Sequence, residues 1–166
     1  VYAPRDKSKT YPILLSKSPY GAHPQSAGDL NPLYATQGYI FVSQDARGRN
    51  RSGGEFLRVA PLHSPGETGA VDASTDTYDT VDWLLKNIPS NNGRVGLKGL
   101  SYEGYYAEAG LIDSHPAVKA VSPQAPESDW YFEGLGRNGA LMLPMAHEGR
   151  KPDGYNYYLN IGPLST

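Results

Sequence analysis

The sequence of 166 residues contains no cysteine. Without thiols the chain can form no disulfide bond, no thiolate nucleophile and no cysteine-ligated zinc site, and the compartment stays open because secreted chains can also lack cysteine. Long hydrophobic runs are missing too. The longest, residues 140–146, is interrupted by Pro144 and is far shorter than the about 20 residues of a membrane-spanning helix. We therefore expect no transmembrane helix and no membrane partner, and residues 1–6 lack the pattern of a signal peptide.

An excess of positive charge is also absent. Lys and Arg total 15 against 17 Asp and Glu, so the formal net charge is −2. This balance argues against nucleic acid as a partner, because binding a phosphate backbone needs a basic surface. The chain is instead rich in turn formers, with 19 Gly and 14 Pro, although not so rich that it falls among low-complexity chains. The composition therefore predicts a folded, turn-rich domain, and no metal-ligand motif of the His-Glu-x-x-His kind occurs.

Hydrophobic patterning predicts an α/β fold. Residues 12–16 and 38–44 are short, nearly continuous apolar runs bounded by turn residues, as is typical of central parallel strands buried on both faces. The patterns that follow predict a helix, a strand, a helix and a strand at residues 73–87, 94–99, 102–112 and 118–122. This order with short connections predicts a doubly wound, mostly parallel sheet with helices on both faces.

The helix expected at residues 73–87 is amphipathic. Its apolar positions, among them Tyr78, Val81, Trp83 and Leu84, broadly follow helical spacing and predict a buried face. The expected opposite side carries four acidic residues, Asp72, Asp76, Asp79 and Asp82.

Residues 95–104 place Ser101 at the turn between a predicted strand and a predicted helix. This is the context of the nucleophile elbow, where a tight turn exposes the serine hydroxyl at the carboxyl edge of the sheet, close to backbone N–H groups that stabilise an oxyanion. The usual pattern has its second glycine two residues after the serine, whereas here Glu103 occupies that place and Gly104 follows it. A serine between a strand and a helix is also a common N-cap, so this pattern alone leaves both roles open.

Several further motifs accompany the serine segment in a fixed order. They are Ser18-Pro19-Tyr20-Gly21, residues 44–49 with 52–56, residues 76–84, residues 92–96, residues 99–104 and Ser128-Asp129-Trp130. Together, over residues 1–146, they resemble the X-prolyl dipeptidyl-peptidase and cocaine-esterase family of α/β-hydrolases, and most of all its α-amino-acid ester hydrolase and glutaryl-cephalosporin acylase branch. The resemblance implies an α/β-hydrolase-type sheet.

The resemblance also implies roles for three residues. Ser101 matches the nucleophile of the family, and Tyr102, which follows it, matches the donor of a backbone N–H to the oxyanion. Tyr20 in the Pro-Tyr motif matches the tyrosine whose hydroxyl is the second oxyanion donor. A phenol suits this task because its rigid ring holds the O–H at a fixed point. No cofactor is implied.

Charged residues near these positions are expected to support the site. Asp45 and Arg47 follow the carboxyl end of a predicted strand, where α/β sites form. We expect a structural role for both, with Arg47 paired to a carboxylate such as Asp79 or Glu103. Glu103 also complements the amino terminus of the predicted helix.

The base and the acid that orients it are the missing parts of this site. In the family both lie far downstream, beyond a helical cap, so the resemblance implies the nucleophile-bearing part of the fold without the carboxyl-terminal strands and the cap. The predicted organisation is a hydrolase core at residues 1–128 and the irregular, aromatic-rich start of a cap region at residues 129–166. Within the chain, Asp129 and His147 have the right order for an acid and a base.

All four histidines are expected to be solvated or packed, namely His23, His63, His115 and His147, with His147 kept as the possible base. The predicted function is a serine hydrolase that cleaves ester or amide bonds through an acyl-enzyme, with a small-molecule or peptide acyl substrate. The alternative is a non-catalytic, hydrolase-like binding module or an inactive fragment. Either could pair with a second copy of itself or with the remaining part of a hydrolase, because an open sheet edge invites pairing.

Overall fold

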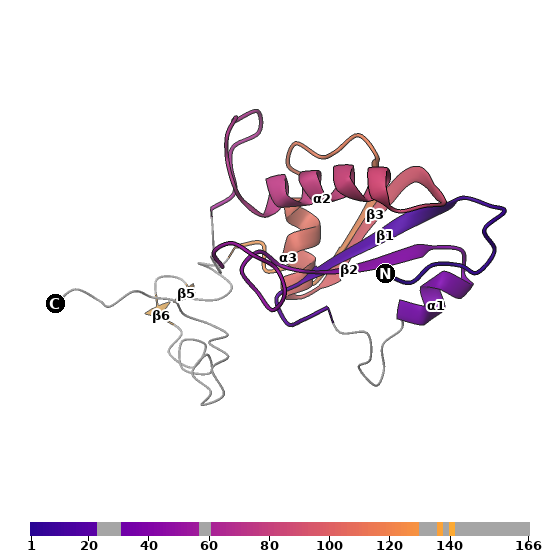
Figure 1. Cartoon of the computed structure of the whole chain (residues 1–166). Helices are drawn as coiled ribbons and strands as arrows, with labels where there is room; N and C mark the ends of the chain where they lie inside the picture. Colours follow the sequence, from indigo (N-terminus) through magenta and orange to yellow (C-terminus); the bar gives the residue numbers. More distant parts are fainter. Residues whose placement is uncertain (23–30, 57–60, 130–135, 138–139, 142–166) are drawn as a thin grey trace. The chain divides into compact units, whose positions relative to one another are not determined.

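The structure is a computed structural model that describes residues 1–22, 31–56, 61–129, 136–137 and 140–141 (Figure 1). The chain divides into two compact units. The first comprises Val1–Phe56 and Ala60–Pro126, and the second comprises Leu57–Val59 and Glu127–Thr166. In the second unit the described strands, β5 (Gly136–Arg137) and β6 (Ala140–Leu141), form an antiparallel pair.

The first unit contains four strands and three helices among its described residues. In chain order they are β1 (Tyr11–Ser18), α1 (Asn31–Thr36), β2 (Ile40–Asp45), α2 (Ala73–Asn87), β3 (Asn91–Leu100), α3 (Tyr102–Ala109) and β4 (Val118–Gln124). None of the helices in the described part of the chain has the length and apolar character needed to cross a membrane.

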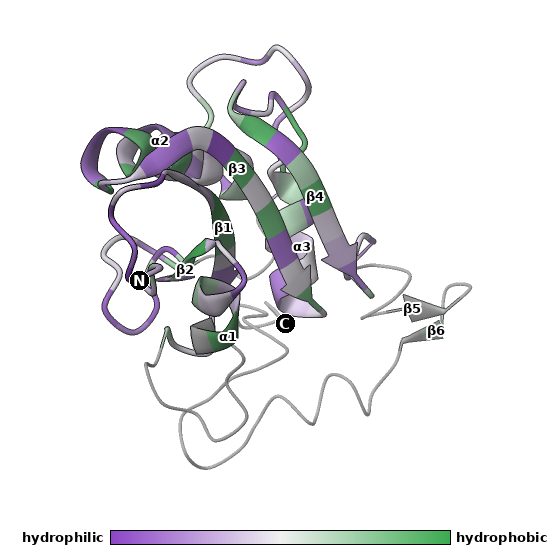
Figure 2. Cartoon of the chain, turned by 90° about the vertical axis from the view of Figure 1, so that its right-hand side faces the viewer, coloured by the Kyte–Doolittle hydropathy of each residue, from purple (hydrophilic) through white to green (hydrophobic). Residues whose placement is uncertain are grey.

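The four strands form one parallel sheet in the order β2-β1-β3-β4. Because β-α-β crossovers are right-handed, the change of direction at β1 puts α1 on one face and α2 and α3 on the other, and Figure 2 shows α1 and α3 on opposite sides of the strands. The predicted doubly wound sheet is therefore confirmed. The prediction of two central strands is correct for β1, whereas β2 lies at one end of the four strands and pairs on its other side only through the bridge between Phe41 and Tyr2.

The core lies between the sheet and the two helices α2 and α3. Strand residues that alternate along β1 and β3 supply one side of it, because successive side chains of a strand point to opposite faces. Helices α2 and α3 supply the other side. The buried strand residues are Ile13, Leu15, Val95 and Leu97 together with Ile40 and Val42 of β2, and the helix residues packed with them include Val81, Leu84 and Ala107.

Helix α2 has the predicted bounds, and its capping explains where it begins. The Asp72 side chain accepts hydrogen bonds from the backbone N–H groups of Ser74 and Thr75, and the Thr75 hydroxyl accepts one from Asp72 N–H, a capping box. The helix faces differ from the prediction in part. Asp72 is buried rather than on the exposed acidic side, whereas Tyr78 and Trp83 are 42% and 57% exposed.

Two helices differ from the predicted pattern. Helix α1 was not predicted, although parallel neighbours such as β1 and β2 need a crossover. Its six residues, with a proline at the second position, are too few to show a clear helical period. Helix α3 ends at Ala109 rather than at residue 112, with Gly110 as its C-cap.

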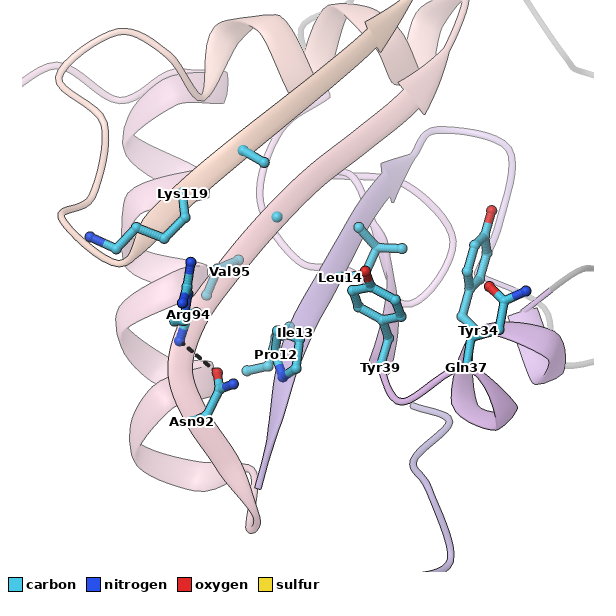
Figure 3. Close-up of a pocket in the computed structure, with 12 residues that line it drawn as sticks. Pro12, Ile13, Leu14, Tyr34, Gln37, Tyr39, Asn92, Arg94, Val95 and Lys119 are labelled. Carbon is cyan, nitrogen blue, oxygen red and sulfur yellow. Dashed lines mark hydrogen bonds between the residues drawn. The ribbon is translucent and has the colours of Figure 1, made fainter. Parts of the chain in front are cut away.

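The sheet face on the side of α1 is hollowed over β1, β3 and β4. A cavity of about 540 Å³ is lined there by residues that include Leu14, Tyr34, Arg94 and Lys119. Figure 3 shows these residues around the amino-terminal half of the strands. Its polar lining includes Arg94 and Lys119 but no carboxylate. The cavity thus lies at the amino-terminal half of the parallel strands, away from the edge that carries Ser101.

Helix α3 approaches β4 closely at Gly104. A Cβ atom built on Gly104 would lie 2.7 Å from the Gln124 carbonyl oxygen and 3.2 Å from Pro126 Cα. Both neighbours are backbone atoms, which cannot move aside as a side chain can. A residue with a side chain at this position would therefore push the helix away from the strand.

We expect Gly104→Ala to lower the free energy of unfolding by about 1–3 kcal/mol, the usual penalty for overpacking a tight contact. Gly53→Ala is the matched control, because a Cβ atom there would meet no atom within 4 Å, and it should change stability by less than about 0.5 kcal/mol. Urea denaturation followed by circular dichroism measures both. Equal losses in the two variants would contradict the close packing of α3 on β4.

Candidate active site

The carboxyl ends of the four parallel strands meet at one edge of the sheet, which is where α/β proteins build their sites. Ser101, directly after β3, is tied to the end of β4 because its backbone N–H donates to the Gln124 carbonyl oxygen at 2.9 Å. The end of β1 is tied in the same way to the residue after β2, since Ala46 N–H donates to the Ser18 carbonyl oxygen at 2.9 Å. The segments after β3 and β4 are thus held side by side, and so are those after β1 and β2.

Ser101 has a strained backbone. Its φ is 59° and its ψ is −123°, a combination that residues with a side chain rarely adopt and that costs about 1–3 kcal/mol. The residue stands at the N-cap position of α3, but its side chain makes no capping hydrogen bond. Ser101 is also exposed. The helix-capping alternative therefore lacks the hydrogen bond that would define it, and the hydroxyl lies at the surface of the carboxyl edge.

Two glycines make this turn possible. A Cβ atom on Gly99 would clash with the carbonyl group of Glu103, and one on Gly104 would clash with β4. The first turn of α3 thus folds back over the end of β3 with no space for side chains at these positions. The glycine three residues after the serine serves close packing of the helix, so the shift from the usual spacing leaves the sharp turn intact.

The ring of Tyr102 is the centre of an aromatic cluster below the turn. It is 4% exposed and stacks on Tyr106 with centroids 5.4 Å apart, while Tyr105 packs edge-on at 6.0 Å. Tyr20 approaches the same ring edge-on at 6.2 Å. Burial raises the pKa of Tyr105 to about 12 and also raises that of Tyr106, so these phenols stay neutral at physiological pH. The cluster brings Tyr20, from the segment after β1, beside the residue that follows Ser101.

Asp45 ties the segment of Tyr20 to the loop after β2. Its Oδ1 accepts a hydrogen bond from Ala22 N–H at 2.6 Å, and its Oδ2 accepts one from Arg51 N–H at 3.2 Å. The carbonyl oxygen of Pro19 accepts further hydrogen bonds from Arg49 Nε at 3.1 Å and Asn50 Nδ2 at 3.4 Å. The backbone on both sides of Tyr20 is therefore fixed by the loop that follows β2.

Arg47 pairs with a different carboxylate from those predicted. Its Nε donates to Asp76 Oδ2 at 2.9 Å, and its Nη2 makes a second, short contact with Asp76 Oδ1. Asp76 and Asp79 are one helical turn apart on α2, and the sequence pattern cannot tell which of the two meets a given loop. Asp79 is exposed, and Glu103 lies half-buried in the first turn of α3.

Lys17 is a buried charged residue that the sequence reasoning missed. It is 5% exposed, and its Nζ lies 3.4 Å from Thr77 Oγ1 and 5.9 Å from the centroid of Tyr106. Burial lowers the pKa of the Lys17 amine to about 8, although Asp76 opposes the shift. The signal was present in the sequence, because the alternation that buries Ile13 and Leu15 puts Lys17 on the same face.

None of the histidines is hydrogen-bonded to Ser101 in the described part of the chain. His63 is buried between Asp72 and Asp113, and His115 follows α3 and accepts a hydrogen bond from Ala117 N–H at 3.1 Å. The prediction of a solvated or packed side chain holds for both, since His63 is buried against Asp72 and Asp113, although this contact with two carboxylates was not predicted. His23 and His147 lie outside the described residues.

Asp129 is exposed and belongs to the second unit. Among the residues that the structure describes, no group of three or more histidine and carboxylate side chains could hold a metal ion.

Comparisons with known proteins identify the family. The family profile for X-Pro dipeptidyl-peptidase (S15 family) matches residues 1–156. Cocaine esterase from Rhodococcus sp. (strain MB1 Bresler) is 30% identical over 148 residues, which are 86% of this chain and 24% of that protein.

Solved structures of related enzymes resemble this chain in fold as well as in sequence. The crystal structure of an aminopeptidase from the marine sediment archaeon Thaumarchaeota archaeon matches with a TM-score of 0.69 and 39% identity, over 80% of this chain and 23% of that one. A selenomethionine-labelled α-amino acid ester hydrolase matches with a TM-score of 0.68 and 34% identity, over the same shares.

The chain thus spans about a quarter of the length of these relatives. Its four-stranded parallel sheet corresponds to part of the α/β-hydrolase fold, which confirms the predicted fold class. The homologues are hydrolases of ester and peptide bonds. Sequence and fold together show that the chain belongs to the X-Pro dipeptidyl-peptidase (S15) family of serine hydrolases.

Proposed function

We propose that this chain supplies the nucleophile and the oxyanion donors of a serine hydrolase that cleaves ester or amide bonds through an acyl-enzyme. The observation that carries the proposal is the backbone of Ser101, held at a φ of 59° between β3 and α3 with its side chain exposed and not used as a helix cap. A strained residue at the carboxyl edge of a parallel sheet is a signature of function.

In the proposed reaction Ser101 Oγ attacks the carbonyl carbon of the substrate while a general base takes its proton. The carbonyl oxygen becomes a tetrahedral oxyanion, which accepts hydrogen bonds from Tyr102 N–H at the amino terminus of α3 and from the Tyr20 hydroxyl. Collapse of this intermediate breaks the bond to the alcohol or amine, which leaves with the proton from the base. Water, activated by the same base, then releases the acid from Ser101.

The packing around Tyr20 supports its proposed role. Its ring lies against Tyr102, and the loop after β2 fixes the backbone on both sides of it. A donor held in this way loses little freedom when the oxyanion forms, which is how preorganised donors lower a barrier. Asp45 is proposed as the anchor of this loop, and Arg47 as its link to α2 through Asp76.

The remaining proposed roles concern charge. Glu103 lies in the first turn of α3, where a carboxylate complements the helix dipole. Asp79 contributes to the negative field that faces Arg47 and Lys17 from α2. His147 and Asp129 stay the proposed base and acid within this chain. The proposed substrate is a small-molecule or peptide acyl compound, which agrees with relatives that act on esters and peptides.

A second candidate function is a non-catalytic, hydrolase-like binding module. The observation that favours it is the hollowed sheet face beside α1, which a catalytic role does not use. A parallel sheet is ordinarily covered on both faces. This candidate predicts that Ser101 has no special reactivity, so the reactivity of Ser101 separates the two functions.

We expect a fluorophosphonate probe to modify the folded chain at Ser101 and to leave Ser101→Ala unmodified, as measured by peptide mapping with mass spectrometry. Ser90→Ala is the matched control, because Ser90 is also a serine at positive φ, 61°, at the opposite end of β3, and it should be modified like the wild type. Labelling that persists in Ser101→Ala, or that is absent from a folded wild type under all conditions, would contradict the proposal.

Added imidazole identifies the source of the base. If His147 reaches Ser101, labelling is independent of imidazole and falls in His147→Ala. If no histidine of this chain reaches Ser101, labelling is slow and imidazole accelerates it in the wild type but not in Ser101→Ala, since a small base can replace an absent side chain. Both outcomes support Ser101 as the nucleophile, and the first also supports His147.

We expect Tyr20→Phe to slow labelling of Ser101 about a hundredfold or more, the effect of removing one oxyanion donor. Tyr39→Phe is the control, because Tyr39 lines the cavity on the other side of the sheet and should label at the wild-type rate. Rates are measured by quenching the reaction at intervals. Equal rates in Tyr20→Phe and the wild type would remove Tyr20 from the oxyanion site while leaving Ser101 as the nucleophile.

A further inference from the structure

His63 lies between two carboxylates in a part of the fold that the proposed reaction does not use. Its Nδ1 is 2.7 Å from Asp72 Oδ2, and its Nε2 is 3.2 Å from Asp113 Oδ2. The side chains of His63 and Asp72 are each 3% exposed, whereas that of Asp113 is 47% exposed. Bulk water therefore has little access to the imidazole ring.

This geometry determines the protonation state of the ring. A neutral imidazole has one N–H donor and one acceptor nitrogen, whereas an imidazolium has two donors. Ionised carboxylates only accept hydrogen bonds, so a neutral His63 would point a lone pair at one of the two carboxylates. Both hydrogen bonds can form together only when both ring nitrogens carry a proton.

The bridge joins three segments that are distant in sequence. His63 belongs to the loop at residues 61–70, Asp72 caps the amino terminus of α2, and Asp113 follows α3. Asp113 also accepts a hydrogen bond from Gly66 N–H at 2.7 Å, and Asp72 accepts one from His63 N–H at 2.8 Å. Each carboxylate thus holds the loop through its backbone as well as through the ring.

Asp113 has a left-handed backbone conformation in the turn after α3. Its φ is 43°, in the left-handed region that is unfavourable for residues with a side chain, although aspartate tolerates it better than most. The hydrogen bonds to His63 and Gly66 are the contacts that hold the Asp113 side chain in this conformation. Loss of the ring contact would leave the loop with fewer constraints.

We propose that His63 is a pH-sensitive switch. With both ring nitrogens protonated, it binds the loop at residues 61–70 to the amino terminus of α2 and to the turn after α3, and it releases this loop when the ring loses a proton. The proposal does not depend on Ser101 being a nucleophile. It predicts a local opening on the alkaline side rather than a change in the catalytic groups.

The charges around the ring set the direction of the effect. Hydrogen bonds to Asp72 and then to Asp113 raise the pKa of His63 above its ordinary value of 6.5. Burial alone would raise the pKa of Asp72, but hydrogen bonds from Thr75 and His63 lower it to about 2. The hydrogen bond from Gly66 N–H, followed by the contact with His63, lowers the pKa of Asp113. Both carboxylates therefore stay ionised while His63 titrates.

Other charged groups act on the cluster at longer range. Tyr105 from α3 and Lys17 from β1 interact electrostatically with Asp72, and Glu67 in the loop accepts a hydrogen bond from Ser64 N–H. The amine of Lys17, with its pKa lowered to about 8, has the opposite effect on stability, because its burial becomes less unfavourable as pH rises. Comparison between variants cancels this contribution, since Lys17 is present in all of them.

A group with a raised pKa in the folded state stabilises the fold fully below its unfolded pKa and loses that contribution as pH rises through the folded value. The stabilisation by His63 should therefore be complete below about pH 6.5 and disappear above it, at the raised pKa. The contribution of Asp72 is lost only in strong acid, as pH falls from its ordinary range toward about 2.

The test is an NMR titration of the 166-residue chain with labelled histidine from about pH 5 to about pH 9, with the His63 signal assigned by His63→Gln. We expect a midpoint above 6.5.

Asp113→Asn is the decisive variant, because an asparagine amide can still accept a hydrogen bond from Gly66 N–H and can donate one to a neutral ring. This variant should lower the midpoint of His63 and reduce the fall in Tm with rising pH. His115→Gln, which removes a histidine bonded to a backbone N–H, should leave the His63 midpoint and this fall in Tm unchanged.

Hydrogen exchange measures the opening itself. Above the midpoint, the amides of His63 and Gly66 should lose protection relative to those of β1 and β3, after correction for the intrinsic pH dependence of exchange. A His63 midpoint at or below 6.5, a midpoint that Asp113→Asn does not move, or equal changes of protection in the loop and the sheet would each overturn the proposal. If His63→Gln fails to fold, the His63 signal is assigned by elimination, because His23→Gln, His115→Gln and His147→Gln each remove one of the other three histidines.

Discussion

The positive φ of Ser101 depends on two backbone contacts that only glycine permits. Gly99 lets the first turn of α3 fold over the end of β3, and Gly104 lets the helix lie against the backbone of β4. The core between α3 and the sheet then holds the helix in this position. Packing energy from the core thus offsets the strain at the serine, which is how folds maintain unfavourable conformations at functional positions.

Polar contacts organise the segments after the strands, together with the aromatic packing of Tyr20 on Tyr102. Asp45 and the carbonyl of Pro19 accept hydrogen bonds that join the segment of Tyr20 to the end of β2 and the loop after it. Arg47 connects this loop to α2 through Asp76. The sheet therefore fixes where each segment begins, and the hydrogen bonds fix the path that the segment takes from there.

The sequence patterns predicted the features that depend on residues close together in the chain, and not the contacts between distant segments. The bounds of α2 follow from its cap, and the turn at Ser101 follows from its glycines and from the family resemblance. Arg47 was predicted to pair with a carboxylate such as Asp79 or Glu103, whereas it pairs with Asp76, one turn from Asp79, because periodicity does not determine how a helix is rotated against a distant loop. The His63 cluster was missed for a similar reason, since Asp113 is 50 residues away in sequence and no spacing rule connects the two.

The strand order has a consequence for how the chain folds. Ile13 in β1 pairs with Ile40 on one side and with Val95, 82 residues further along, on the other. The centre of the sheet therefore cannot close until most of the first unit has been brought together, and the entropy lost in closing so long a loop precedes the contacts that compensate for it. We expect this topology to fold slowly compared with helical domains of the same length, with the edge of β1 that faces β3 open to wrong partners in the meantime.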